Sequence, residues 1–184
     1  ERLFENRIRS RSKIQYNDID YLNISHNQRK TAKAKEYQKS YNYKQIIHTI
    51  RYMPCETLLQ KRNRAIISLQ AVCTLRISEL RTVKIKNIIQ EDGVYFVHVC
   101  PKNMEVKFAK TRHVVFVPLP DDIIANIIEW QNYLLSIGFS GSDPLFPKIN
   151  NKFGKTHMLE IKISKDEIKS NATIRDVFET AFIE

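Results

Sequence analysis

The feature that most constrains this chain is an octapeptide, residues 73–80, that ends an apolar helical pattern and precedes a β-rich stretch. The octapeptide reads Cys-Thr-Leu-Arg-Ile-Ser-Glu-Leu and contains Arg76 and Glu79. The β-rich stretch contains Lys110 within the sequence Phe-Ala-Lys-Thr. A guanidinium can clamp the non-bridging oxygens of a phosphate, and a lysine on a nearby hairpin can protonate a leaving oxygen. This combination therefore indicates phosphoryl transfer on DNA.

The charge balance favours a polyanionic partner. Thirty Lys and Arg residues oppose twenty Asp and Glu residues, which gives a net charge of +10. Such an excess favours nucleic acid binding, although a basic surface can also serve solubility alone. With 184 residues, of which 42% are hydrophobic, the chain is long and apolar enough for one domain with a buried core and an appendage. A wholly disordered chain is therefore disfavoured.

The cysteines and the hydropathy argue against several other classes of protein. Cys55, Cys73 and Cys100 are odd in number and widely spaced, which disfavours both a disulfide framework and a zinc site. We expect all three to be small apolar core thiols in a reducing compartment. No segment reaches the ~18 consecutive apolar residues of a membrane span. The expected location is therefore the cytoplasm, with no membrane partner and no bound metal.

Apolar residues at helical spacing predict two helices near the start of the domain. The first covers residues 43–53 and ends at Pro54, and the second runs from residue 56 or 62 to residue 72. A short helix that carries Arg76 and Glu79 should follow. The expected inner face of the second helix consists of Ala65, Ile66, Leu69 and Val72.

A long helix should follow Asp121, which can cap it, and Gly138 supplies its left-handed end. Its inner face consists of Ile123, Ile124, Ile127, Trp130 and Leu134, with Trp130 as a core anchor. A rigid connector follows at residues 143–147. The loop after it contains Asn, Lys and Gly residues, and its sequence predicts no regular secondary structure. Residues 164–167 then read as a capping box for a last helix. The face of that helix consists of Ile174, Val177, Phe178, Ala181 and Phe182.

Between the short and the long helix, β-forming residues predict a small sheet. Residues 88–89 and 94–100 flank a turn at residues 91–93 and form a hairpin. A third strand should cover residues 106–117 and end at Pro118. The expected fold class is therefore α+β, mainly α, with a small three-stranded antiparallel sheet.

Residues 1–42 form a polar, basic arm or linker, or the end of a core DNA-binding domain. A block of like charge is either a solvated surface or a phosphate-binding segment. The arm residues that we expect to contact DNA are Arg29, Lys30, Lys33 and Lys35. The interleaved tyrosines could contact sugars and bases or dock onto the domain.

The order of these motifs resembles the catalytic domain of tyrosine recombinases, the phage-integrase family. In that family a helix carries T-G-x-R-x-x-E-L and a β-turn carries a lysine. The resemblance covers about residues 43–184 and includes Asp-Pro-Leu-Phe-Pro at residues 143–147. It implies a fold of the DNA breaking-rejoining type, with Arg76 as the first catalytic arginine, Glu79 as its supporting acid and Lys110 as the general acid.

The resemblance also implies a reaction and partners. A tyrosine attacks a DNA phosphate, which gives a 3′-phosphotyrosyl link and a free 5′-hydroxyl without a metal or cofactor. The implied function is site-specific recombination or integration, and the implied partners are double-stranded DNA and other recombinase protomers on that DNA. Lys107, Arg112 and His113 lie next to the lysine motif and are expected DNA contacts.

Two local features depart from the family's first motifs. Thr74 stands where the family has glycine, so the backbone before Arg76 should be unable to use conformations reserved for glycine. Lys107 lies three residues before Lys110 and is the alternative hairpin lysine.

The second motif box of the family, His-x-x-Arg followed by a His or Trp and then the tyrosine, has no match. Neither His nor Tyr occurs after His157, and Glu160 takes the place of the arginine. We therefore expect these 184 residues to be the N-terminal part of a catalytic domain that binds DNA without cutting it. The alternative is a non-catalytic DNA-binding or regulatory protein on the same scaffold. An unrelated RNA-binding protein is a third reading, but no recognition signature supports it.

Overall fold

The computed structural model describes residues 40–153 and 159–182. Contacts group Tyr41–Glu184 into one compact unit. The four arm residues that we expect to contact DNA lie outside the described residues, as do His157 and the arm tyrosine Tyr37.

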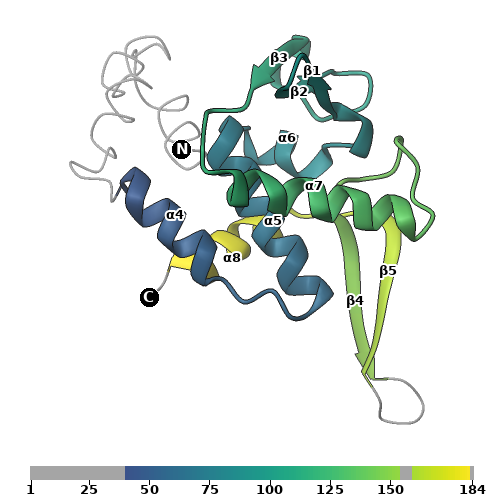
Figure 1. Cartoon of the computed structure of the whole chain (residues 1–184). Helices are drawn as coiled ribbons and strands as arrows, with labels where there is room; N and C mark the ends of the chain where they lie inside the picture. The colour runs from purple at the N-terminus through teal and green to yellow at the C-terminus, as the bar shows by residue number, and fades with distance from the viewer. Residues whose placement is uncertain (1–39, 154–158, 183–184) are drawn as a thin grey trace, which may run out of the picture. The chain divides into compact units, whose positions relative to one another are not determined.

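Five α-helices form the body of this unit (Figure 1). They are α4 (Tyr43–Tyr52), α5 (Leu58–Cys73), α6 (Ile77–Thr82), α7 (Asp121–Ser136) and α8 (Asn171–Phe182). Side-chain caps stabilise the N-termini of α4 and α5, since the Asn42 side chain accepts the Gln45 N–H and the Thr57 side chain accepts the Gln60 N–H. The predicted helices at the start of the domain are thereby confirmed.

Helices α4, α7 and α8 pack against α5. Its predicted inner face is buried, and so are Ile123, Ile127, Trp130 and Leu134 on α7. The indole N–H of Trp130 donates to the Leu145 carbonyl oxygen at 2.8 Å, which confirms this residue as a core anchor. On α8, Ile174 and Val177 are buried. Figure 1 shows α8 beside α4, and the Tyr41 hydroxyl donates to the Phe182 carbonyl oxygen at 3.2 Å.

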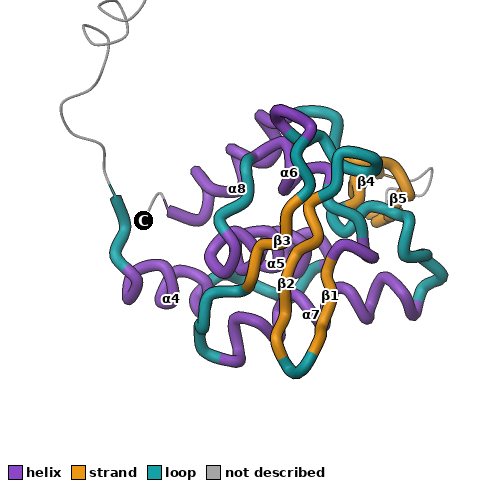
Figure 2. The backbone as a smooth tube through the Cα atoms, turned by 90° about the horizontal axis from the view of Figure 1, so that it is seen from above, coloured by secondary structure: helices purple, strands orange, loops and turns teal. Residues whose placement is uncertain are grey.

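The predicted three-stranded antiparallel sheet is present on one side of the helices (Figure 2). Its strands are β1 (Ile88–Glu91), β2 (Val94–Val99) and β3 (Arg112–Val115), in the order β1-β2-β3. Gly93 makes the hairpin turn with a φ of +78°. Val97 and Val99 of β2 face the core. The fold is therefore α+β and mainly α.

The third strand is shorter than predicted. It begins at Arg112, because Lys107–Ala109 forms a single 3-10 turn. Phe108 and Ala109 have φ values of 64° and 48°, and strand pairing needs negative φ. The prediction that Asp121 caps the long helix is also wrong, since Asp121 is the first helical residue and Pro120 occupies the cap.

The structure contains a second hairpin that the sequence did not predict. Strands β4 (Pro147–Phe153) and β5 (Leu159–Glu167) follow α7 and precede α8 in the chain, and they pair antiparallel. Figure 1 shows the hairpin projecting from the helices. Residues 164–167 lie in β5, so the predicted capping box is wrong and α8 begins later, at Asn171. The alternation Leu-Glu-Ile-Lys-Ile at residues 159–163 is a strand pattern, but its partner strand does not alternate clearly.

The cysteines and the membrane prediction have mixed outcomes. Cys73 is buried as expected, but Cys55 is exposed and Cys100 is half-buried. Among the described helices, none combines the length and the apolar character that crossing a membrane would require.

Candidate nucleic-acid interface and catalytic site

The turn that leads to Arg76 is strained. Thr74 ends α5 with φ 42° and ψ 51°, and its N–H donates to the Gln70 carbonyl oxygen at 2.9 Å. The expectation that Thr74 avoids a conformation typical of glycine is therefore wrong. A left-handed conformation costs a residue with a Cβ atom about 1–2 kcal/mol. The turn ends α5 and places Arg76 immediately before α6.

Glu79 holds Arg76 in place through two hydrogen bonds. Arg76 precedes the first turn of α6 with extended backbone, and Glu79 lies within that turn. The Glu79 Oε2 accepts the Arg76 backbone N–H at 3.0 Å, and Oε1 accepts from Arg76 Nη1 at 3.3 Å. Half of the Arg76 side chain remains exposed, whereas Glu79 is fully buried. The free N–H groups of Arg76 are therefore open to a phosphate.

Arg112 completes the surroundings of the buried carboxylate. Its Nη1 donates to Glu79 Oε1 at 3.0 Å and its Nη2 donates to Oε2 at 2.6 Å, which is a bidentate pair. Burial raises the pKa of Glu79, but hydrogen bonds from Arg112 and the Arg76 backbone outweigh this effect and lower the pKa below its usual value. Glu79 is thus a carboxylate at neutral pH. We call Arg76, Glu79 and Arg112 the Glu79 cluster.

The two candidate lysines flank Phe108 and Ala109, the two residues with positive φ before β3. Lys107 and Lys110 are both exposed, and neither forms an ion pair with a residue in the described part of the chain. The Lys107 Nζ lies 4.9 Å from the centre of the Phe108 ring, a cation–π contact. Lys110 follows the turn directly and lies two residues before Arg112. This arrangement is compatible with either lysine.

His113 lies on the other side of the sheet from Arg112. Adjacent strand residues alternate between faces, and His113 pairs across the strands with His98. The His98 Nδ1 and the His113 Nε2 are 2.6 Å apart. His113 is exposed, but strand alternation separates its side chain from the Glu79 cluster.

Residues 36–183 match the model of the phage integrase family. The chain belongs to the phage integrase family. Comparison with curated proteins gave no match.

Solved structures support the integrase fold. Two of the similar structures are of the XerH site-specific recombinase, one bound to difH substrate before cleavage and one bound to palindromic difH substrate after cleavage. Each has a TM-score of 0.50, 16% sequence identity and covers 78% of this chain. This chain covers 37% and 36% of those chains, so it spans little more than a third of their length. At this identity the likeness shows the fold, which is the expected DNA breaking-rejoining type.

Sequence analysis missed a buried arginine, Arg81, that connects α6, the helix after Arg76, to other parts of the fold. Arg81 on α6 donates to the Ile168 carbonyl oxygen at 2.8 Å and to Asn171 Oδ1 at 2.9 Å. It also forms an ion pair with Glu105 at 2.5 Å. Arg81 thus ties the helix after Arg76 to the start of α8 and to the loop before the lysines. The sequence around Arg81 did not predict this role, because the residues that Arg81 contacts are distant from it in the sequence.

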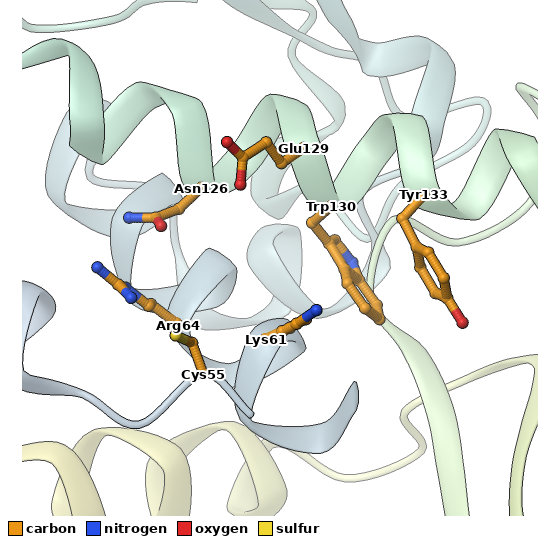
Figure 3. A pocket seen from close by; sticks show the side chains of 7 residues that line it. All are labelled: Cys55, Lys61, Arg64, Asn126, Glu129, Trp130 and Tyr133. Atoms are coloured by element: carbon orange, nitrogen blue, oxygen red, sulfur yellow. The ribbon is translucent and has the colours of Figure 1, made fainter. Parts of the chain in front are cut away.

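A separate pocket of about 370 Å³ lies between α5 and α7 (Figure 3). Figure 3 shows side chains from the start of α5 on one side and from α7 on the other. The lining residues are Cys55, Lys61, Arg64, Asn126, Glu129, Trp130 and Tyr133. None of them is among the site residues predicted from the sequence. Within the described ranges, no group of three or more His, Cys, Asp or Glu side chains could hold a metal ion.

Proposed function

We propose that this chain binds duplex DNA and supplies the first half of the active site of a site-specific tyrosine recombinase. The observation that carries the proposal is the Glu79 cluster, in which a buried carboxylate fixes Arg76 and leaves half of its side chain exposed. Arg76 would stabilise the phosphate oxygens, Glu79 would orient Arg76, and Lys110 would protonate the departing 5′-oxygen. Lys107 remains the alternative general acid.

These roles follow from the charges that develop during strand cleavage. When a tyrosine hydroxyl attacks the phosphorus, negative charge grows on the non-bridging oxygens and needs fixed cations. The bond to the 5′-oxygen breaks, and that oxygen needs a proton. The products are a 3′-phosphotyrosyl link and a 5′-hydroxyl. Because a matching nucleophile is missing before Glu184, we propose that these 184 residues bind DNA without cutting it.

The proposed partners are double-stranded DNA and other recombinase protomers on that DNA, in the cytoplasm. XerH, the recombinase of the similar structures, is bound to its difH substrate. Phosphate contacts position a protein on DNA without reading sequence and make affinity depend on salt. We propose such contacts for Lys107, Lys110 and His113 and for the arm residues Arg29, Lys30, Lys33 and Lys35.

A duplex binding assay with a nicked suicide substrate tests the proposal. We expect Arg76→Ala and Lys110→Ala, with the arm neutralised, to weaken duplex binding, and we expect no covalent adduct from this chain. Unchanged duplex binding in these variants would favour the RNA-binding reading. A covalent protein–DNA adduct would refute the statement that the chain lacks its nucleophile.

The second candidate is a non-catalytic DNA-binding protein on the integrase scaffold. Within these 184 residues neither His nor Tyr follows His157, a feature with which both candidates are compatible. The reading frame beyond the codon for Glu184 separates the two candidates. A His-x-x-Arg motif followed by a tyrosine supports the recombinase, and a stop codon supports the non-catalytic protein.

A further inference from the structure

We propose that Arg112 is a positioning residue that acts through Glu79, so that Glu79 orients Arg76 without neutralising it. This inference rests on the proposed role of Arg76 as the phosphate clamp. It replaces the simpler expectation that the Arg112 side chain contacts DNA directly.

The hydrogen bonds of Glu79 are divided evenly between the two arginines. Oε1 accepts from Arg76 Nη1 at 3.3 Å and from Arg112 Nη1 at 3.0 Å. Oε2 accepts from the Arg76 backbone N–H at 3.0 Å and from Arg112 Nη2 at 2.6 Å. A carboxylate has about four acceptor positions, so Glu79 is saturated. Arg112 takes the bidentate position, and the Arg76 guanidinium keeps a single long bond.

The charge of the cluster depends on this division. Two guanidinium groups and one carboxylate give a net charge of +1. Without Arg112, the buried Glu79 would have Arg76 as its remaining cation in the cluster, and the pair would be neutral. A buried carboxylate that loses a partner recruits the nearest donor, because an unpaired buried charge is unfavourable. Arg76 would then turn inward and lose its capacity to bind a phosphate.

The position of Arg112 in the chain connects the segment that carries Lys110 to the segment that carries Arg76. Arg112 is the first residue of β3, and Lys110 lies two residues before it. Glu79 belongs to α6, which begins immediately after Arg76. The bidentate bond therefore ties the strand that follows the lysine turn to the helix that follows the arginine. No other hydrogen bond between α6 and β3 is present among the described residues.

The test measures how the affinity of the full chain for a short DNA duplex falls with salt. Each phosphate contact contributes about 0.9 to the slope of log affinity against log salt, or about 3.5-fold over a fourfold change in salt. We expect Arg76→Ala to lower the slope by about one contact. An unchanged slope in Arg76→Ala would overturn the proposed phosphate clamp and this inference with it.

Arg112→Lys and the double variant Arg112→Met with Glu79→Gln separate the possible roles. Lysine keeps the charge but cannot occupy both carboxylate oxygens, so we expect Arg112→Lys to lower the slope toward that of Arg76→Ala. The double variant removes both charges and frees Arg76, so we expect its slope to return to the wild-type value. Circular dichroism checks that each variant is folded.

Three results would overturn the inference even if Arg76 binds a phosphate. A wild-type slope in folded Arg112→Lys would mean that Arg112 serves the fold alone or contacts DNA as a simple cation. A lowered slope in the double variant would mean that Arg112 itself contacts a phosphate. The matched control is Arg51→Lys, because Arg51 forms a bidentate pair with Asp122 at 2.8 and 3.0 Å on α4 and α7. An equal loss in this control would make the Arg112 effect nonspecific.

Discussion

At Glu79, burial and hydrogen bonding act on the pKa in opposite directions. Burial favours the neutral acid, whereas the donors from Arg112 and Arg76 favour the carboxylate and lower the pKa below its usual value. A carboxyl group with a lower pKa in the folded state stabilises the fold above its unfolded pKa. That stabilisation is lost as the pH falls through the folded pKa.

We therefore predict that Glu79→Gln destabilises the fold at pH 7 by about 3 kcal/mol, since it leaves the arginines without their counterion. The difference in unfolding free energy between wild type and variant should shrink as the pH falls below the usual value of 4.5. Urea unfolding at several pH values measures it. Asp122→Asn is the control, because that exposed pair should contribute little. A difference that is constant with pH would contradict the prediction.

Thr74 gives a second prediction at the scale of one residue. Thr74→Gly should raise the unfolding free energy by about 0.5–1 kcal/mol, because it removes a left-handed strain of about 1–2 kcal/mol and adds about 0.5–1 kcal/mol of backbone entropy. Thr74→Ala keeps the Cβ atom and its strain, so it should give no such gain. Thermal and urea unfolding measure both variants. A glycine variant less stable than the alanine variant would contradict the prediction.

At the scale of elements, sequence patterns correctly predicted the helices and turns that depend on residues close together in the chain. The helical spacing of Ile66, Leu69 and Val72 predicted α5, and the turn at Gly93 predicted the first hairpin. Failures occurred where the structure depends on distant contacts or unusual backbone. The residue types at positions 107–109 do not predict the positive φ values of Phe108 and Ala109. Strand β4 can be recognised only through its pairing with β5. In the same way, Arg76 and Glu79 were predicted as a pair by their spacing, but the bond from Arg112 joins residues 33 apart.

Arg81 gives the prediction at this scale. Because Arg81 joins α6 to the start of α8 through buried hydrogen bonds, Arg81→Ala should destabilise the fold by about 3 kcal/mol. The control Arg51→Ala removes an exposed ion pair and should cost at most about 1 kcal/mol. Urea unfolding compares them. Equal losses in the two variants would show that Arg81 does not connect the elements.

At the scale of the whole molecule, the net charge of +10 is the property most relevant to the proposed partner. Charge acts on DNA affinity through the release of counterions, and its effect depends on which cations meet phosphates. The arm and the compact unit can therefore be compared by removing equal numbers of charges from each.

We predict that neutralising four arm residues to Gln lowers the salt slope of duplex binding by up to about 3.6, since each phosphate contact contributes about 0.9. The four residues are Arg29, Lys30, Lys33 and Lys35. The matched control neutralises four exposed cations of the compact unit, namely Lys61, Lys148, Lys169 and Arg175. Duplex titrations at several salt concentrations measure both. An equal slope change in the two variants would mean that the arm acts through its overall charge rather than through specific phosphate contacts.

The β4–β5 hairpin has a consequence for engineering this protein. Pro147 and Glu167 are paired residues, so the chain leaves and re-enters the body at neighbouring points. The base of the hairpin belongs to the body, because Ile149 and Ile163 pack against the core and Arg62 donates to the Pro147 carbonyl oxygen at 3.1 Å. A short linker can therefore replace only the strand residues beyond Ile149 and Ile163. A fluorescent label or an affinity tag placed within it would report on the molecule while leaving the residues around Arg76 untouched.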